Sequence, residues 1–586
     1  MSSDDSPKNR YIGAIVGEST CNEFRLAVAP DSVREQDIIA VDAELRQPDN
    51  TSQKIRVWAK VQRIERLNPL FPAEAGHELA ATETDPFDTV LSLSREMVTA
   101  VCQVLGSESL EGNKAGKLDH LRYPPKPASS AYGPNADDIA RIVLGALQTQ
   151  ENQKSALDIA TLSNRPEVDV KIDGHTIVMR HLAILAMTGA GKSWTSRRII
   201  EQLAEKNYPI VIFDPRGDYT GLADVEKLKG RVRRYYAQFP VFEQDPETVL
   251  TVVEALGWKL ANTHSSLFEA LFEGAKRFIQ CDAAQLKQRA NWLSCHLNNP
   301  QIAEYGLKPN FYFFADFVQA LLKAAKEKEE DGTALDTLIE WCGQEKLKID
   351  KKTAGYLDGL PMNLRTAAKS LREMEDVNKR VAASNEPLPT DRTELVRHGG
   401  VSVISLAGYA GNFQATICSL IAKAIFNARV TSKLKWPAFL VLEEAHNFVP
   451  ASASTPAEER SIATIRQIAQ EGRKFRVGLL LISQRPSRLD ETTLSMCNSF
   501  IIMRMVNPAD QNFVRRVMET LGEEEVRMLP DLDKGEAILS GQMINFPVLA
   551  KIKQPDSRGE REESNAFDAL EEDFQASLKE ARRQTH

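Results

Sequence analysis

A glycine-rich turn between an apolar run and Gly-Lys-Ser carries the clearest chemistry in this sequence. Residues 183–193 are Ala-Ile-Leu-Ala-Met-Thr-Gly-Ala-Gly-Lys-Ser. The apolar residues suit a buried parallel strand, and the glycines let backbone N–H groups curl around a phosphate chain. Lys192 is expected to reach the β- and γ-phosphates, Ser193 to place its hydroxyl on Mg²⁺, and a helix opening at Ser193 to direct its positive end at the anion. The pattern predicts a P-loop.

The match to the P-loop pattern departs at its first position, where Ala186 replaces the usual glycine. A dinucleotide-binding turn is a weaker interpretation, because it needs a third small residue where Trp194 stands. A chance glycine turn between a core strand and a helix is the structural alternative. Under the P-loop interpretation, the residues expected to contact the nucleotide are Thr188, Gly189, Ala190, Gly191, Lys192, Ser193 and Trp194.

A second apolar run, residues 438–442, ends in two adjacent carboxylates followed by Ala-His-Asn. This arrangement is typical of a Walker B strand. Glu443 is expected to hold Mg²⁺ through an oxygen or a water, and Glu444 to orient or deprotonate the attacking water. Most P-loop proteins have aspartate at the first position, so Glu443 favours water-mediated metal contact. Zinc is disfavoured because Glu443 and His446 lack the order His-Glu-x-x-His.

Polar residues follow two further apolar runs. Asp214 and Asp218 come after residues 208–213, and Gln484 comes after residues 477–483. In a parallel sheet, residues just past the carboxyl end of a strand border the ligand crevice, which places Asp214 near the nucleotide and makes Gln484 a candidate to sense the γ-phosphate or position the water. Ordinary turn residues are the alternative in both cases.

Arg473 lies one residue past Gly472, where the helical pattern of residues 465–474 is expected to end. Arg473 and Lys474 can satisfy the last carbonyls of that helix. The sharper possibility is an arginine finger, which acts on the γ-phosphate of a neighbouring subunit.

The pattern of strands and helices that would position these residues predicts an α/β protein. Short alternating runs between residues 11 and 64 indicate a small barrel, and alternating strands and helices from about residue 180 indicate a P-loop core. Residues 81–116 fit a helix or strands equally well, and residues 156–179 fit strands that return to the barrel or introduce the P-loop strand. The predicted parts are a disordered stretch at 1–10, a barrel-like domain at 11–122, a connector with a helix and a possible barrel strand at 123–170, an ATPase domain at 171–555 with a helical insertion at about 241–398, and an acidic tail at 556–586.

The composition is that of a globular protein, and 586 residues can form two to four domains. The chain contains no long apolar run, and residues 1–10 are too polar for a signal peptide, so we expect a cytoplasmic protein without membrane association. Seven cysteines without a C-x-x-C pair indicate incidental thiols in a reducing compartment. A formal net charge of −8 does not exclude nucleic acid, because a closed channel can be basic while the outside is acidic. The basic stretch 227–234 fits a channel loop or an exposed connector, and we favour the connector.

Five segments occur in one order: the P-loop, Asp-Pro-Arg-Gly-Asp-Tyr at 214–219, Leu-Glu-Glu-Ala-His-Asn-Phe-Val-Pro at 442–450, Glu-Gly-Arg-Lys-Phe at 471–475 and Ser-Gln-Arg-Pro at 483–486. Together they closely resemble the HerA family of DNA-pumping ATPases, relatives of FtsK, over residues 180–550. The resemblance implies a RecA-like core behind a small β-barrel, with ATP and Mg²⁺ at the subunit interfaces of a homohexamer and duplex DNA in its channel. It also implies a separate effector, either a NurA-type nuclease or an antiviral effector such as a sirtuin-like NADase.

Two functions of different class are compatible with these residues. The first is an ATP-driven DNA translocase or helicase. The second is a nucleotide-gated scaffold ring that assembles and regulates an effector with little translocation. The ATPase rate measured with and without duplex DNA distinguishes them.

Overall fold

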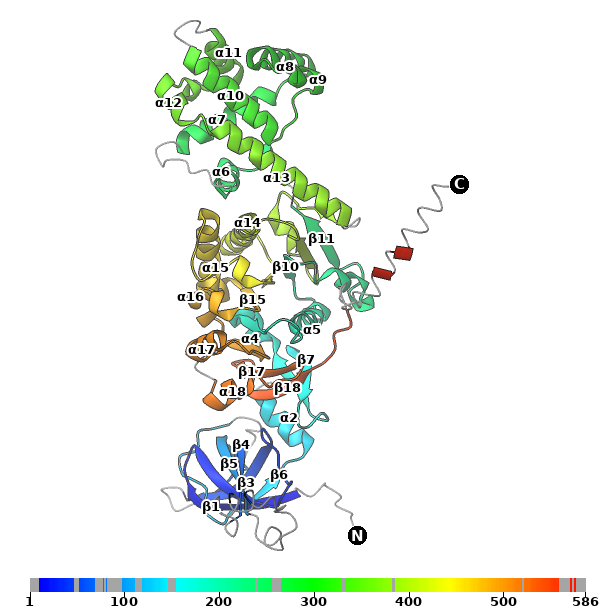
Figure 1. Cartoon of the computed structure of the whole chain (residues 1–586), viewed down its shortest axis with the longest axis vertical. Coiled ribbons are helices and arrows are strands. Elements are labelled where there is room, and N and C mark those ends of the chain that lie inside the picture. The colour runs from blue at the N-terminus through cyan, green and yellow to red at the C-terminus, as the bar shows by residue number, and fades with distance from the viewer. Residues whose placement is uncertain are drawn as a thin grey trace. The chain divides into compact units, whose positions relative to one another are not determined.

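The computed structural model describes residues 10–46, 52–68, 77, 81, 97–110, 118–145, 154–237, 241–255, 265–327, 333–381, 385–518, 521–557, 570–571 and 574–575. The chain divides into two compact units. Unit 1 comprises residues 1–202 and 497–554, and unit 2 comprises residues 203–496 and 555–586. Residues 1–9 of the expected disordered stretch 1–10 and most of the tail lie outside the described residues, whereas Arg10 is the first residue of a strand. Figure 1 traces the chain through both units.

A closed six-stranded barrel forms the first part of unit 1, as the alternating runs predicted. Its strands pair in the order β1-β2-β5-β4-β3-β6. Strand β2 shows the alternation clearly, since Phe24, Leu26 and Val28 are buried and the residues between them are exposed. The strands are β1 (Arg10–Ser19), β2 (Glu23–Val28), β3 (Ile38–Arg46), β4 (Ser52–Leu67), β5 (Met97–Ser109) and β6 (Ser130–Gly133).

The barrel extends past the predicted boundary at residue 122. Strand β6 lies within 123–170, the range predicted to hold a connector, a helix and a possible barrel strand, and its Tyr132 pairs with Tyr11 of β1 and with Ala40 of β3. Both edges of the sheet are satisfied only when β6 lies between them, so this short strand closes the barrel. Four residues in a proline- and serine-rich stretch carry too weak a local pattern to be recognised as a strand.

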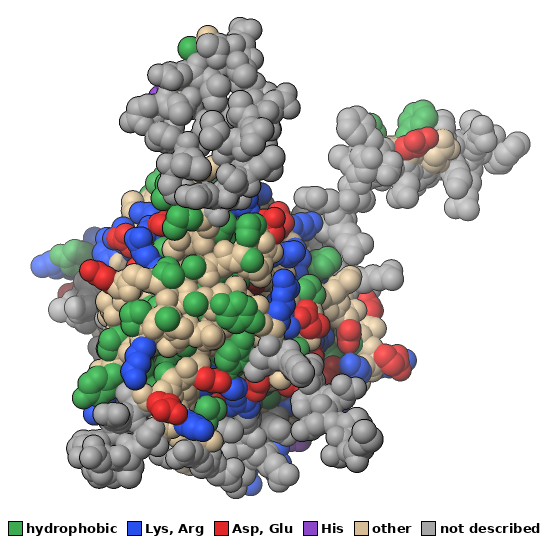
Figure 2. All heavy atoms as spheres, turned by 90° about the horizontal axis from the view of Figure 1, so that it is seen from below, with side chains coloured by type: hydrophobic (Ala, Val, Ile, Leu, Met, Phe, Trp, Pro, Cys, Tyr) green, Lys and Arg blue, Asp and Glu red, His purple; other side chains and the backbone are tan. Residues whose placement is uncertain are grey.

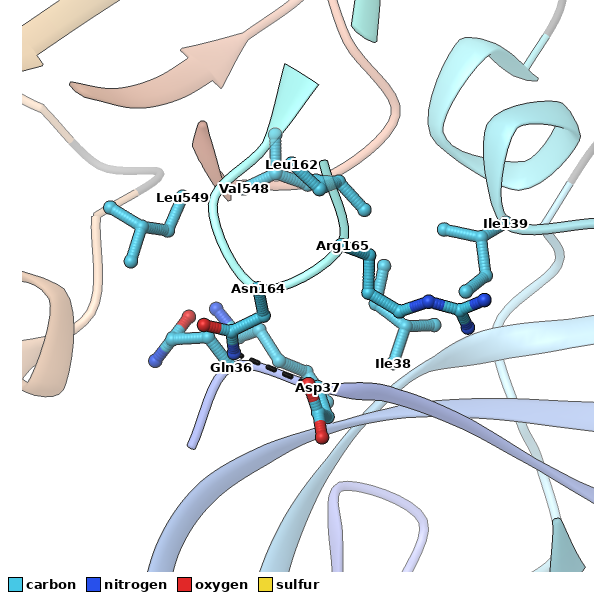
Figure 3. Close-up of a pocket in the computed structure, with 10 residues that line it drawn as sticks. Gln36, Asp37, Ile38, Ile139, Leu162, Asn164, Arg165, Val548 and Leu549 are labelled. Atoms are coloured by element: carbon cyan, nitrogen blue, oxygen red, sulfur yellow. Dashed lines mark hydrogen bonds between the residues drawn. The ribbon is translucent and has the colours of Figure 1, made fainter. Parts of the chain in front are cut away.

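A buried ion pair joins the barrel to the rest of unit 1. Lys60 Nζ of β4 lies 2.6 Å from Glu525 Oε1 of α18 (Glu523–Met528), and the two side chains are 3% and 7% exposed. Beside it, the turn after β7 meets the barrel, where Asn164 donates to the carbonyl of Glu35 at 2.5 Å and to Asp37 Oδ1 at 3.2 Å (Figure 3). The barrel is therefore held by specific polar contacts.

Among the described residues of unit 1, five other strands continue the sheet from the P-loop strand β9 (Leu182–Leu185). They run in the order β9-β16-β17-β18-β7-β8, with β9 and β16 parallel and the remaining pairs antiparallel. Residues 156–173 therefore join this sheet and not the barrel, which answers the question that the sequence left open. The remaining residues of the stretch 156–179 lie in helix α4 (Gly174–Arg180) and not in a strand. The strands are β16 (Ser499–Met503), β17 (Glu536–Gly541), β18 (Val548–Ile552), β7 (Ala156–Leu162) and β8 (Asp169–Asp173).

Unit 2 contains six strands, all parallel, in the order β12-β11-β13-β10-β14-β15. The middle strands are buried throughout, as expected for a sheet covered on both faces. Helices α14 (Gly411–Val430) and α15 (Pro456–Phe475) pack against each other beside it. The strands are β12 (Glu386–Pro387), β11 (Val232–Tyr236), β13 (Val401–Ser405), β10 (Ile210–Asp214), β14 (Ala438–Leu442) and β15 (Val477–Ser483).

The predicted insertion is helical and has an aromatic core. Phe242, Phe272 and Phe314 lie with ring centroids 5.4–5.9 Å apart. Figure 1 shows α13 running from this bundle toward β11. The helices are α6 (Pro246–Ala255), α7 (Ser265–Ile279), α8 (Ala283–Leu297), α9 (Pro300–Tyr305), α10 (Phe311–Glu327), α11 (Thr333–Cys342), α12 (Lys351–Tyr356) and α13 (Leu360–Val381).

The basic stretch 227–234 is not simply an exposed connector. Its second half lies in β11, where Arg233 pairs with Ser402 of β13 through the backbone while the Arg233 side chain stays exposed. Over the part of the chain that the structure describes, no helix combines the length and apolar character needed to cross a bilayer.

Candidate active site

The P-loop occupies the turn between β9 and α5 (Lys192–Glu205) in unit 1. Gly189 and Gly191 have positive φ angles of 82° and 109°, which glycine adopts without strain. A Cβ at Gly189 would meet nothing within 4 Å, whereas one at Gly191 would lie 3.1 Å from Met503 Cε and 3.4 Å from Gly535 Cα. One glycine therefore borders open space and the other lies against the protein, as a phosphate-binding turn requires.

The surroundings of Ala186 explain why a residue other than glycine is tolerated at the first position of the P-loop. Its side chain is fully buried at the end of β9, and its φ is not positive. An L-residue with a small side chain fits such a position without backbone strain.

The expected nucleotide-binding residues differ in exposure. Thr188 and Gly189 are exposed, Ala190 is 3% exposed and Lys192 is 6% exposed, while Trp194 is 37% exposed. Helix α5 begins at Lys192, one residue before the predicted start. Thr188 and Gly189 therefore face outward, whereas Ala190 and Lys192 are buried in the fold.

Two backbone contacts that the sequence did not predict hold the P-loop from outside. Gly535 N–H donates to the carbonyl of Ala190 at 2.9 Å, and Met187 N–H donates to the carbonyl of Arg504 at 3.0 Å. Gly535 has a φ of 82°. The turn before β17 thus stabilises the P-loop. The sequence contains no local signal for this contact, because Gly535 is an isolated glycine some 340 positions away from the P-loop.

The two carboxylates lie in unit 2, directly after β14. Glu443 and Glu444 are 0% and 1% exposed. Glu444 adopts a left-handed conformation with φ 50° and ψ 52°, which is uncommon for a non-glycine residue and is often found at functional sites. The phenol of Tyr219 donates to Glu443 Oε2 at 2.6 Å.

Asp214 organises the turn that carries Tyr219. Its Oδ1 accepts the backbone N–H groups of Arg216, Gly217 and Asp218 at 2.8–3.2 Å, and its Oδ2 accepts that of Tyr219 at 3.2 Å. Burial raises the pKa of Asp214 to about 6, the backbone donors at Gly217 and Tyr219 oppose this rise, and the nearby carboxylates of Asp218 and Glu443 add to it. Asp214 therefore shapes the turn, and its position near the nucleotide stays a prediction.

Three side chains surround the Glu444 carboxylate. Gln484 Nε2 donates to Oε1 at 2.6 Å, and Arg216 Nη2 lies 2.9 Å from the same oxygen. His446 Nδ1 lies 3.5 Å from Oε2. The pairing of Gln484 with Glu444 was not foreseen, nor were the contributions of Arg216 and Tyr219, although both lie in the stretch 214–219 that the sequence singled out.

Arg473 is exposed in the last turn of α15, and the prediction of the helix end was wrong. The helix continues through Gly472, which is buried, to Phe475, and Arg476 caps it in the left-handed conformation. A glycine inside a helix costs up to about 1 kcal/mol, which packing readily offsets. Arg473 therefore projects from a helix and not from a loop.

Within the described ranges, no group of three or more His, Cys, Asp or Glu side chains could hold a metal ion by itself. All seven cysteines are free thiols.

Comparisons with known proteins agree with this arrangement. Residues 157–425 match the family model described as Helicase HerA, central domain. A probable helicase of Methanocaldococcus jannaschii is 28% identical over 97% of this chain and 95% of its own length. The DNA double-strand break repair helicase HerA of Pyrococcus furiosus is 25% identical over 92% of both chains. VirB4 of Thermoanaerobacter pseudethanolicus aligns with 68% of this chain and 96% of its own at 15% identity and a TM-score of 0.39, too remote a likeness for a functional inference.

The turn after β9 is the phosphate-binding loop of a P-loop ATPase, and the buried carboxylates after β14 are of the Walker B type. The class predicted from the sequence, an α/β core with a helical insertion behind a small barrel, is confirmed. The chain is similar to the HerA helicases, whose central-domain model matches residues 157–425 and whose named members are 25–26% identical over most of the chain.

Proposed function

We propose that this chain hydrolyses ATP to translocate duplex DNA and that it works as a homohexameric ring. The position of Glu444 is the observation that supports ATP hydrolysis. Its carboxylate is buried at the carboxyl end of a parallel strand, with the amide of Gln484 on one oxygen. A carboxylate held at such a place can orient a water and accept its proton.

The remaining residues take roles that follow from their chemistry. Lys192 neutralises the β- and γ-phosphates, and the amides of residues 188–194 bind the phosphate oxygens. Gln484 keeps Glu444 oriented toward the water. Arg473, exposed at the end of α15, supplies the positive charge that completes a neighbouring subunit's site.

The residues present fit Mg²⁺ with a nucleoside triphosphate. The open space beside Gly189 leaves room for phosphate oxygens. Ser193 and Glu443 would hold the ion, since hydroxyl and carboxylate oxygens are its preferred ligands. The ion supplies neutralisation of the charge that develops on the phosphates. This donor set is the one predicted from the sequence.

DNA as the substrate is supported by the relatives whose names describe them as helicases, which match nearly the whole chain. We further propose that a separate effector, a NurA-type nuclease or an antiviral effector such as a sirtuin-like NADase, docks on the barrel. Figure 2 views the barrel side of the molecule, where hydrophobic side chains lie among charged ones. Leu67 and Met97 pair across β4 and β5 and are 63% and 55% exposed.

The ATPase rate with and without duplex DNA tests the motor. We expect stimulation by DNA and binding that weakens steeply with salt, because phosphate contacts release counterions. Lys192→Ala should abolish hydrolysis and weaken ATP binding, whereas Glu444→Gln should bind ATP without cleaving it. An ATPase rate that does not change with DNA, together with DNA binding that does not weaken with salt, would refute the motor and favour the scaffold ring.

Docking is tested by co-purification with a NurA-type nuclease and with a sirtuin-like NADase. Replacing Leu67 and Met97 by lysine should abolish the complex and leave ATP hydrolysis intact, because both side chains are on the barrel surface. Retained binding in the double variant would place the docking surface elsewhere.

A further inference from the structure

Glu444 is restrained by two donors on a single oxygen. Gln484 Nε2 lies 2.6 Å and Arg216 Nη2 lies 2.9 Å from Oε1. The Gln484 contact is a hydrogen bond and the Arg216 contact is an ion pair, and both act on the same carboxylate oxygen. Together they fix the orientation of the Glu444 carboxylate.

The two partners of this ion pair differ in their access to solvent. The Glu444 side chain is 2% exposed, whereas that of Arg216 is 50% exposed. A half-exposed guanidinium can exchange a protein contact for water at little cost, while the carboxylate cannot leave its position. The arginine is therefore the partner that can be released.

The turn that carries Arg216 does not depend on this ion pair. Asp214 holds it through four backbone N–H groups, and Gly217 adopts a φ of 85° that completes it. The Arg216 side chain can thus rotate away without disturbing Tyr219, whose hydroxyl holds Glu443 from the same turn.

We propose that Arg216 is a positioning residue that keeps Glu444 in a resting orientation and that each hydrolytic cycle requires its release. This inference rests on the proposed function, in which Glu444 accepts the proton of the attacking water. Arg216 acts through Glu444 and not on the substrate. Gln484 remains in place as a neutral donor when Arg216 leaves.

The test compares Arg216→Ala with wild-type protein in steady-state ATP hydrolysis without DNA. We expect kcat to rise about two- to fivefold, the range that a half-exposed ion pair can supply, with the KM for ATP unchanged. Arg216→Lys, which retains the charge, should return kcat toward the wild-type value. Arg460→Ala is the matched control, since Arg460 is also half-exposed and pairs with the largely buried Glu254, away from Glu444.

The outcomes separate this inference from the proposed function. A lower kcat in Arg216→Ala would mean that the ion pair holds Glu444 in its productive orientation, and an unchanged kcat would mean that it is incidental; either result overturns the inference. Wild-type protein without ATPase activity would refute the proposed function itself. Arg216→Gln, which keeps a neutral donor, replaces the alanine variant if that one does not fold, with a smaller increase expected.

Discussion

The phenol of Tyr219 donates a hydrogen bond of 2.6 Å to Glu443 Oε2, and 224 positions of sequence separate the two residues. Both side chains are fully buried. A buried carboxylate keeps one orientation only if donors hold it there, because water cannot replace them. The turn 214–219 therefore contacts both carboxylates after β14, Glu443 through Tyr219 and Glu444 through Arg216.

Tyr219→Phe should weaken the response of the protein to Mg²⁺. Without the hydroxyl, Glu443 loses a donor that orients it, and the loss should cost about 1–3 kcal/mol of stability. We expect a higher Mg²⁺ concentration at half-maximal ATP hydrolysis and a lower melting temperature. Tyr208→Phe, just before β10, is the control. An unchanged Mg²⁺ dependence would show that Glu443 does not need Tyr219.

Asp214→Asn should change how stability depends on pH. Burial raises the pKa of Asp214 from 3.8 to about 6 in the folded protein, so ionisation is easier in the unfolded chain. Its contribution to stability is therefore largest below pH 3.8 and falls as the pH rises to 6, by about 3 kcal/mol in total.

The asparagine variant carries no such penalty and loses the carboxylate acceptor for Tyr219 N–H at every pH. The melting temperature of the variant should consequently rise relative to that of wild type as the pH increases from about 4 to 6. Melting curves recorded across this range provide the measurement. Parallel pH profiles for the two proteins would contradict the raised pKa.

The ion pair between Lys60 and Glu525 should behave as a buried pair. Lys60→Met leaves the Glu525 carboxylate buried without its cation, so we expect a loss of about 3–5 kcal/mol. Combining it with Glu525→Leu should restore most of the stability, because two apolar side chains need no partner. Arg63→Met in the exposed pair with Glu65 is the control, with little change expected. If the double variant is as unstable as Lys60→Met alone, the ion pair itself stabilises the contact between the barrel and α18.

Arg473 is tested by mixing two inactive variants. Rings made only of Arg473→Ala subunits and rings made only of Lys192→Ala subunits should both lack activity. Mixed rings should regain it, because an Arg473→Ala subunit still supplies Lys192 and its Lys192→Ala neighbour still supplies Arg473. A complete finger contributes a factor of about 10³–10⁵ in rate, so the recovery is measurable as ATP hydrolysis.

Mixed assembly can be verified with two affinity tags. If verified mixed rings recover no ATP hydrolysis, Arg473 is excluded as a finger that acts between subunits. Arg466 would be a poor substitute, since Asp490 Oδ2 holds its Nη2 at 2.6 Å. Arg485 is exposed after β15 and would become the better candidate.

Local patterns were sufficient where one continuous segment contains the whole feature. Gly189, Gly191 and Lys192 follow a buried strand within a few residues, and Glu443 and Glu444 end another, so strand burial and glycine conformation made both predictable. Gly472 shows the limit of the same reasoning. Glycine commonly ends helices, but here a packed helix continues through it.

The sequence by itself determined that the chain is an α/β P-loop protein with a preceding barrel and a carboxylate pair, because periodicity, glycine and adjacent charges act over short stretches of chain. Only the tertiary structure decided what holds those groups. Arg216 and Gln484 meet at Glu444, Tyr219 reaches Glu443, and Gly535 braces the P-loop across long separations in sequence. These contacts form because parallel strands bring their carboxyl ends to one edge of a sheet and because buried polar groups must find partners, and neither constraint is written in neighbouring residues.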